Sequence, residues 1–144
     1  MIAIDTNIMV YAHRPEMPLH DRAKAALSDL VASGGRYGLP FHCLVEFAGV
    51  VGHRKIFKVP SSPTQVRKQI DAWLEPPNGW LLTEDEAMLP VFLDALERSK
   101  VAGGAVHDAR IAACCEFHGV KELWSADRDF GRFSRIRFRN PLVD

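Results

Sequence analysis

Four acidic residues stand where their carboxylates could act together at one edge of a sheet. Asp5 follows the short apolar run 1–4, and Asp127 follows a second apolar run near the C-terminus. Asp108 lies in the first turn of an expected helix, and Glu46 lies within another helix. Ends of parallel strands and the N-termini of the helices that follow them meet at one edge. We therefore expect Asp5, Asp108 and Asp127 to converge, with Glu46 joining if its helix crosses that edge.

A cluster of carboxylates needs positive charge beside it. Two carboxylates 4 Å apart repel each other by about 4 kcal/mol at an effective dielectric constant near 20. Oxygen ligands without paired Cys or His favour Mg²⁺ or Mn²⁺ over zinc. Mg²⁺ held by carboxylates and a substrate phosphate oxygen is a common arrangement for cleaving phosphodiesters. The placement of the acids therefore favours a divalent-cation site with that chemistry.

The same acids also have an ordinary structural explanation. Aspartate is a frequent helix N-cap, so Asp5 and Asp108 could cap helices, while Asp127 and Glu46 could form salt bridges. The four residues form no local motif, and among eighteen acidic residues some will follow strands by chance. Spacing alone leaves both explanations open. His107 is not expected to share a cation with Asp108, because adjacent helical residues point about 100° apart. We interpret it as a structural or RNA-facing residue.

Apolar periodicity and turn residues predict alternating strands and helices along the chain. A capping box at 62–65 and a second one formed by Thr83 with Glu86 mark helix starts, and Pro90 should kink or delay the second helix. Strands are expected at 1–4, 37–39, 80–82, 122–126 and 136–138, with helices at 8–11, 19–33, 42–53, 62–75, 83–99 and 105–118.

This alternation predicts one α/β domain over residues 1–144. Strands separated by helical segments form a mostly parallel central sheet with helices on both faces, in three layers. The connections should be right-handed crossovers. The chain shows no internal repeat, low-complexity segment or linker that would divide it.

Composition excludes several classes of protein. Eighteen basic residues balance eighteen acidic ones, so no overall field draws the chain to nucleic acid or membrane, although five arginines crowd the segment 128–139. Three cysteines without metal-site spacing indicate core residues in a reducing compartment. There is no signal-like start and no apolar stretch of about 20 residues, so we expect a cytoplasmic protein without a membrane segment.

Four stretches together resemble a known family. They are Ile-Asp-Thr-Asn at 4–7, Glu46 in an early helix, Val-His-Asp-Ala-Arg at 106–110, and Trp-Ser-Ala-Asp-Arg-Asp-Phe at 124–130. In this order and at this chain length they are similar to a PIN domain, and more narrowly to the VapC-type ribonuclease toxins of toxin–antitoxin pairs. The resemblance covers the whole chain.

The resemblance implies a parallel sheet between helices and an acidic pocket that binds Mg²⁺ or Mn²⁺. It further implies a structured RNA substrate, a small antitoxin partner and a homodimer, for which apolar Leu44, Phe47 and Val51 offer the only independent support. The implied metal-binding and catalytic residues are Asp5, Glu46, Asp108 and Asp127. Asp129 matches a second acid whose participation varies, and the hydroxyls of Thr6 and Ser125 match positions that brace the acids, with Ser125 standing where threonine is commoner.

The expected reaction is in-line attack on phosphorus by a water whose pKa the cation lowers, oriented by Asp108 or Asp127. It should leave a 5′-phosphate and a 3′-hydroxyl. The alternative is a non-catalytic PIN-like module that binds RNA or protein, which a metal titration would distinguish. A dehalogenase-like phosphatase is disfavoured because it needs a second aspartate where Asn7 stands.

Overall fold

Five parallel strands form the central sheet in the computed structural model, which describes residues 1–143. The strand order is β3-β2-β1-β4-β5, and every neighbouring pair runs in the same direction. The central strand β1 pairs with β2 on one side and with β4 on the other. The strands are β1 Ile2–Ile4, β2 Tyr37–Pro40, β3 Gly79–Leu82, β4 Glu122–Trp124 and β5 Arg137–Arg139.

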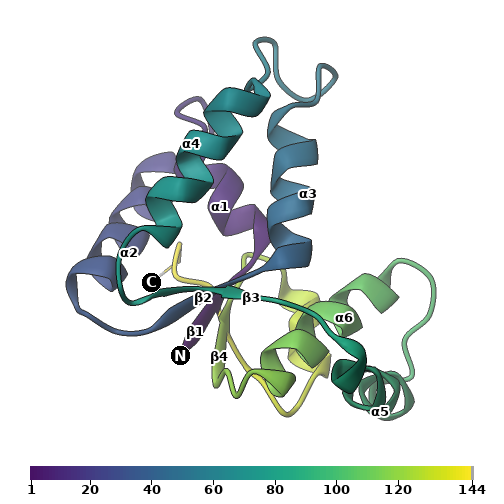
Figure 1. Ribbon diagram of the computed structural model, residues 1–144. Helices are drawn as coiled ribbons and strands as arrows, with labels where there is room; N and C mark the ends of the chain where they lie inside the picture. Colours follow the sequence, from purple (N-terminus) through teal and green to yellow (C-terminus); the bar gives the residue numbers. More distant parts are fainter. Residues whose placement is uncertain (144) are drawn as a thin grey trace.

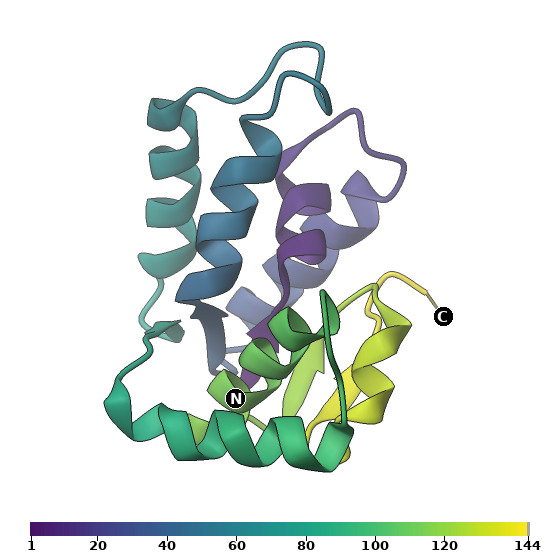
Figure 2. The ribbon, with the colours of Figure 1, turned by 90° about the vertical axis from the view of Figure 1, so that its right-hand side faces the viewer.

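Helices cover both faces of the sheet, as Figures 1 and 2 show. The chain moves from β1 to β2 to β3 in one direction and then returns past them to β4. Right-handed crossovers therefore place the earlier helices on one face and the later two on the other. The first group is α1 Thr6–His13, α2 His20–Ala32, α3 Phe41–Val51 and α4 Pro63–Leu74, and the second is α5 Leu89–Ser99 and α6 Ala105–Phe117. This confirms the predicted three-layer α/β fold.

The strand order reverses between β1 and β4. The connection that leaves β1 goes toward β2, whereas the connection that leaves β4 goes toward β5 on the opposite side. Two connections that diverge in this way leave a crevice beyond the carboxyl ends of the strands, where ligands of open α/β sheets bind. Asp5 follows β1 directly, and Ser125 to Asp127 follow β4.

Most element boundaries differ from the predicted ones by one or two residues, and two of the differences have a clear cause. The strand expected over 122–126 ends at Trp124, because the next residues turn toward α1 and the Ala126 amide donates to Asn7 Oδ1 at 3.0 Å. The helix expected from Thr83 begins as a short 3₁₀ helix, η1 Glu86–Met88, and becomes α-helical only at Leu89. Pro90 thus delays the start, and the cap is Asp85, which accepts from the Ala87 amide at 2.8 Å.

The core fills both sides of the sheet with apolar side chains. Leu44, Phe47 and Val51, which the sequence suggested as an apolar surplus on their helix, are buried in this core. They therefore lend no support to a homodimer. All three cysteines are buried and unpaired, as core residues should be. Among residues 1–143, no helix has the length and apolar character that crossing a membrane requires.

The close approach of β2 to β3 gives a test of this packing. A methyl group on Gly38 would lie 2.6 Å from Leu82 Cδ1 and 2.7 Å from its Cγ, and Leu82 is buried. We expect Gly38→Ala to lower the free energy of unfolding by about 1–3 kcal/mol through overpacking. Urea denaturation followed by circular dichroism would measure the change.

Gly49→Ala is the matched control, because a methyl group there meets nothing within 4 Å. Alanine has the higher helix propensity, so this variant should gain up to about 1 kcal/mol. Equal effects of the two substitutions would contradict the described contact between β2 and β3.

Candidate active site

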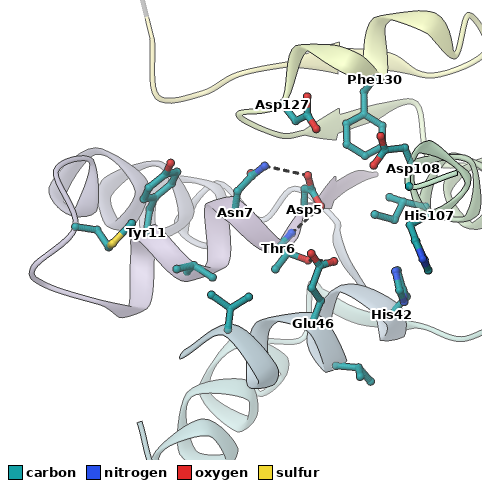
Figure 3. Close-up of a pocket in the computed structure, with 16 residues that line it drawn as sticks. Asp5, Thr6, Asn7, Tyr11, His42, Glu46, His107, Asp108, Asp127 and Phe130 are labelled. Atoms are coloured by element: carbon teal, nitrogen blue, oxygen red, sulfur yellow. Dashed lines mark hydrogen bonds between the residues drawn. The ribbon is translucent and has the colours of Figure 1, made fainter. Parts of the chain in front are cut away.

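A pocket of about 720 Å³ lies at the point where the strand order reverses. Asp5, Glu46, Asp108 and Asp127 all line it, as the spacing of the acids predicts (Figure 3). No lysine or arginine is among the lining residues that the structure describes. The pocket is therefore strongly negative, although the whole chain has no net charge. Its other lining residues are Thr6, Asn7, Val10, Tyr11, Met17, His42, Val45, Val50, Gly104, His107, Ile111 and Phe130.

Asp5 is the most firmly held of the acids. Its side chain is only 5% exposed, and both of its carboxylate oxygens accept hydrogen bonds. Oδ1 accepts from the Thr6 amide at 2.7 Å and Oδ2 from the Ser125 hydroxyl at 2.6 Å. Burial raises the pKa of Asp5 despite these bonds, and the nearby charge of Glu46 raises it further. A cation beside Asp5 would offset the cost of keeping this carboxylate ionised.

The structure separates the two explanations of the acids. Asp5 does cap α1, but the residue before α6 is Gly104, and no side chain caps that helix. Asp108 is thus not an N-cap. Asp127 caps the 3₁₀ helix η2 Arg128–Arg132 by accepting from the Asp129 amide at 2.9 Å. Within residues 1–143, neither Asp127 nor Glu46 forms a salt bridge.

Three carboxylates come closest to one another. One oxygen from each of Asp108, Asp127 and Asp129 lies within 4.8 Å of the other two, a spacing that a single cation could bridge. Asp5 and Glu46 line the same pocket but stand outside this group. Burial, followed by the charges of Asp127 and Asp5, raises the pKa of Asp108 to about 6. Oxygen donors alone make a set that suits Mg²⁺ or Mn²⁺.

Hydroxyl groups connect the acids across the pocket. The Ser125 hydroxyl donates to Asp5 and accepts from the Asp127 amide at 3.0 Å, so it ties the end of β4 to the end of β1. The Thr6 hydroxyl lies 3.2 Å from Glu46 Oε2 and 3.3 Å from the Cys43 carbonyl oxygen, both on α3. These are the two bracing positions that the sequence predicts.

Asn7 and His42 were not predicted to serve the pocket, and His107 was predicted only to be structural or to face RNA. Asn7 donates to Asp5 Oδ2 at 3.1 Å and to the Ser125 hydroxyl at 3.1 Å, so it is a crosslink rather than only a residue of the first helix. His42 and His107 stack on each other beside the acids. The Asp-Thr-Asn sequence was a signal for Asn7, whereas the histidine pair depends on how α3 and α6 approach each other.

Comparison with known proteins agrees with this geometry. The family model described as the PIN domain matches residues 2–136. The chain belongs to the PIN-domain family. Ribonuclease VapC43 of Mycobacterium tuberculosis is 34% identical over 142 residues, which cover 99% of this chain and 96% of that protein. Ribonuclease VapC48 of the same species is 29% identical over 138 residues, or 96% and 95% of the two chains. Membership of the VapC-type group is thereby supported.

Solved structures show the same fold at lower sequence identity. The structure of Mycobacterium tuberculosis VapC20, described as a sarcin–ricin-loop-cleaving toxin, matches with a TM-score of 0.69 and 17% identity, covering 97% of this chain and all of that one. VapBC2 from Rickettsia felis, bound to a promoter DNA fragment, matches with a TM-score of 0.68 and 20% identity over 97% and 98% of the chains.

The raised pKa of Asp108 in this PIN domain gives a pH-dependent prediction. Asp108 holds its proton more tightly in the folded than in the unfolded chain, so its contribution favours folding at low pH and is lost as pH rises to about 6. Asparagine does not ionise, so Asp108→Asn does not lose this stability as the pH rises. After allowance for solvent screening, the variant should be more stable than wild type by about 1 kcal/mol near pH 7.5 in EDTA, and equal to it near pH 4.

Urea denaturation at both pH values would measure the difference, with the exposed Asp94→Asn on α5 as a control expected to change little. Added Mg²⁺ should stabilise wild type more than Asp108→Asn, because a cation that binds only the folded state raises its stability. An Asp108→Asn variant that is less stable than wild type in EDTA at neutral pH would show that Asp108 has a structural partner instead.

Proposed function

We propose that this PIN-domain protein is a divalent-cation-dependent endoribonuclease, the toxin of a toxin–antitoxin pair, that cleaves structured RNA. The observation that carries the proposal is the pocket itself, in which four carboxylates gather among lining residues that include no lysine or arginine, with Asp129 close by and paired with Arg132. Relatives across almost the whole chain are named ribonucleases, and VapC20 is described as a toxin that cleaves the sarcin–ricin loop. A module that only bound RNA would gain nothing from such repulsion.

The residues present suit Mg²⁺ or Mn²⁺. Asp108, Asp127 and Asp129 would supply the nearest oxygens, with Asp5 and Glu46 completing the negative environment. When bound, such a cation supplies positive charge that activates a water and offsets the charge developing on the phosphate. The same charge would favour the ionised form of Asp108, whose pKa the neighbouring acids raise.

The chain's own part is to position groups for in-line attack. Asp108 and Asp127 face the pocket from α6 and from the loop after β4, so either carboxylate can accept a hydrogen bond from the attacking water and orient it (Figure 3). Ser125 and Asn7 hold Asp5 in place through hydrogen bonds to Oδ2. Nothing in this arrangement requires the RNA 2′-hydroxyl as nucleophile.

Metal dependence tests the reaction. Cleavage of purified ribosomal and transfer RNA should require Mg²⁺ or Mn²⁺, stop in EDTA and leave 5′-phosphate ends. Asp127→Asn should lower the rate at least about 100-fold, whereas Asp94→Asn should keep it. End-labelling and gel electrophoresis of the products would measure both. Cleavage that continues in EDTA, or products with 2′,3′-cyclic phosphates, would rule out this chemistry, and cation binding without cleavage would favour the non-catalytic alternative.

The antitoxin would bind in the apolar part of the same pocket. Val10, Tyr11 and Met17 line it from α1 and the loop that follows, and Val45 and Val50 line it from α3. This apolar surface continues into the acids, so the apolar face of an antitoxin helix can lie along α3 while a basic side chain enters the acidic end. VapBC2 from Rickettsia felis and FitAB share this fold, carry two-part names and are described as bound to DNA fragments, which supports a protein partner here.

Val45 is the point at which to test the antitoxin groove, because its side chain is 55% exposed on α3. Val45→Glu places a charge in the apolar part and should weaken binding of the cognate antitoxin at least about tenfold. Val59→Glu, exposed on the loop after α3, should leave the affinity unchanged. Isothermal titration calorimetry would measure both affinities, and equal affinities would place the antitoxin elsewhere.

A homodimer stays a prediction, as does a cytoplasmic location. The exposed apolar side chains that could pack against a second copy lie outside the pocket, and they do not belong to the buried face of α3. They are Trp80 and Leu81 on the edge strand β3, together with Leu89 and Leu93 on α5.

A further inference from the structure

The acidic pocket has two different arms. Figure 3 shows Tyr11 on one side of the acids and the pair His42 and His107 on the other. The Tyr11 side is the apolar part that we assign to the antitoxin. The histidine side has a different chemistry, with two flat aromatic rings beside Glu46 and Asp108, and the reaction as proposed so far makes no use of it.

The two histidines come from different helices and lie parallel. His42 is near the start of α3 and His107 is in the first turn of α6. Their ring centroids are 5.7 Å apart, and the ring planes differ by only 10°. His107 is exposed and His42 is half-buried, so part of the ring surface faces the pocket. The pair therefore presents flat aromatic surface next to the residues that would hold the cation.

Neither ring has a hydrogen bond that explains its presence. Within residues 1–143, each of the other four histidines has a hydrogen-bond partner on at least one ring nitrogen, whereas His42 and His107 have none. The four partnered rings are His13 with Gln69 and Ser61, His20 with the Tyr11 carbonyl, His53 with the Lys55 amide, and His118 with the Thr83 carbonyl. In the part of the chain that the structure describes, every histidine therefore has a polar partner within the protein except the two at the pocket.

The surroundings favour a base over a phosphate as the ligand of this pair. The neighbouring acids repel a phosphate, and the one arginine close to His42, Arg110, holds Glu84 with two hydrogen bonds of 2.7 Å. Nucleobases are flat and uncharged, and unpaired RNA bases commonly stack on aromatic side chains, including histidine. We propose that His42 and His107 form a base-stacking subsite that holds an unpaired nucleobase next to the phosphodiester to be cleaved.

This inference rests on the proposed function only in that the base belongs to the RNA substrate. Stacking on an aromatic side chain tolerates any base, so the pair would contribute affinity and placement rather than a sequence code. It would also require the base to leave its helix, which is easiest in a loop. Replacement of either ring by alanine should therefore weaken RNA binding by about 5- to 150-fold.

The experiment compares His42→Ala and His107→Ala with His42→Phe and His107→Phe, which keep a flat ring without nitrogen atoms. The probe is a fluorescein-labelled RNA hairpin with an all-adenosine loop, and a second hairpin carries abasic residues in the loop. Fluorescence anisotropy in Ca²⁺, which also takes oxygen ligands, measures binding. His53→Ala is the control, because His53 is exposed in the loop after α3 and outside the pocket.

We expect the alanine variants to bind the adenosine hairpin 5- to 150-fold more weakly than wild type, and the phenylalanine variants and His53→Ala to bind it nearly as wild type does. The abasic hairpin should bind wild type weakly. The alanine variants should bind it no more weakly than wild type does, because removing the base already removes the contact that the ring would make. The melting temperature and its increase with Mg²⁺ should persist in all variants.

Three results would overturn the subsite: alanine variants that bind as wild type does, phenylalanine variants as weak as alanine variants, or equal binding of the two hairpins by wild type. If an alanine variant unfolds, the phenylalanine variants and the abasic hairpin decide the question without it. Failure of the nuclease proposal has a separate sign, namely that wild type with Mg²⁺ cleaves no structured RNA while its discrimination between the two hairpins is unaffected.

Discussion

The buried hydrogen bond from the Ser125 hydroxyl to Asp5 Oδ2, 2.6 Å long, is the contact on which the site depends. It joins the ends of β1 and β4, the two strands between which the strand order reverses. Asn7 reinforces the contact by donating to both partners, and the Asp127 amide donates to the same serine hydroxyl. This cluster of hydrogen bonds therefore joins the two strand ends and fixes the position of Asp127 relative to Asp5. A hydrogen bond to a buried carboxylate contributes about 1.5–3 kcal/mol, so the link matters to stability as well.

Charge is distributed so that this edge remains negative in a chain without net charge. Outside the pocket, acids and arginines are paired: Glu122 with Arg137, Glu84 with Arg110, and Glu116 with both Arg98 and Arg135. In each pair the arginine is at least a third exposed, so solvent screening keeps the contribution to stability small. These pairs instead affect the electrostatic field, because they neutralise arginines whose presence in the sequence could suggest RNA binding. Glu122 illustrates this: its burial raises its pKa, yet hydrogen bonds from Arg137 and Trp124 lower the pKa overall.

The parts of the fold and site that depend on local signals could be predicted from sequence. The apolar run 1–4 before Asp5 and the Gly103-Gly104 entry to α6 are local, and they place Asp5 and Asp108 correctly at the sheet edge. The end of β4 could not be predicted, because the hydrogen bond from the Ala126 amide to Asn7 spans 119 positions. Leu44, Phe47 and Val51 were interpreted as support for a homodimer for a related reason. An apolar residue pattern shows which side chains favour burial. It does not show that α1 and α4 pack over them, because that depends on the tertiary structure.

The positions of the two pocket arms follow from the same topology. The α1–α4 layer lies on one face and the α5–α6 layer on the other, and side chains from both layers meet at the reversal point. The apolar arm is built within the first layer, from α1 and α3, whereas the histidine arm needs His42 from the first layer and His107 from the second. A ligand that stacks on the histidines therefore contacts both layers, and one that lies along α3 contacts a single layer. Because the acids stand between the arms, a basic side chain arriving from the apolar arm and a cation with its RNA phosphate compete for the same charge. Inhibition and catalysis would then exclude each other through electrostatics, with no change of fold required.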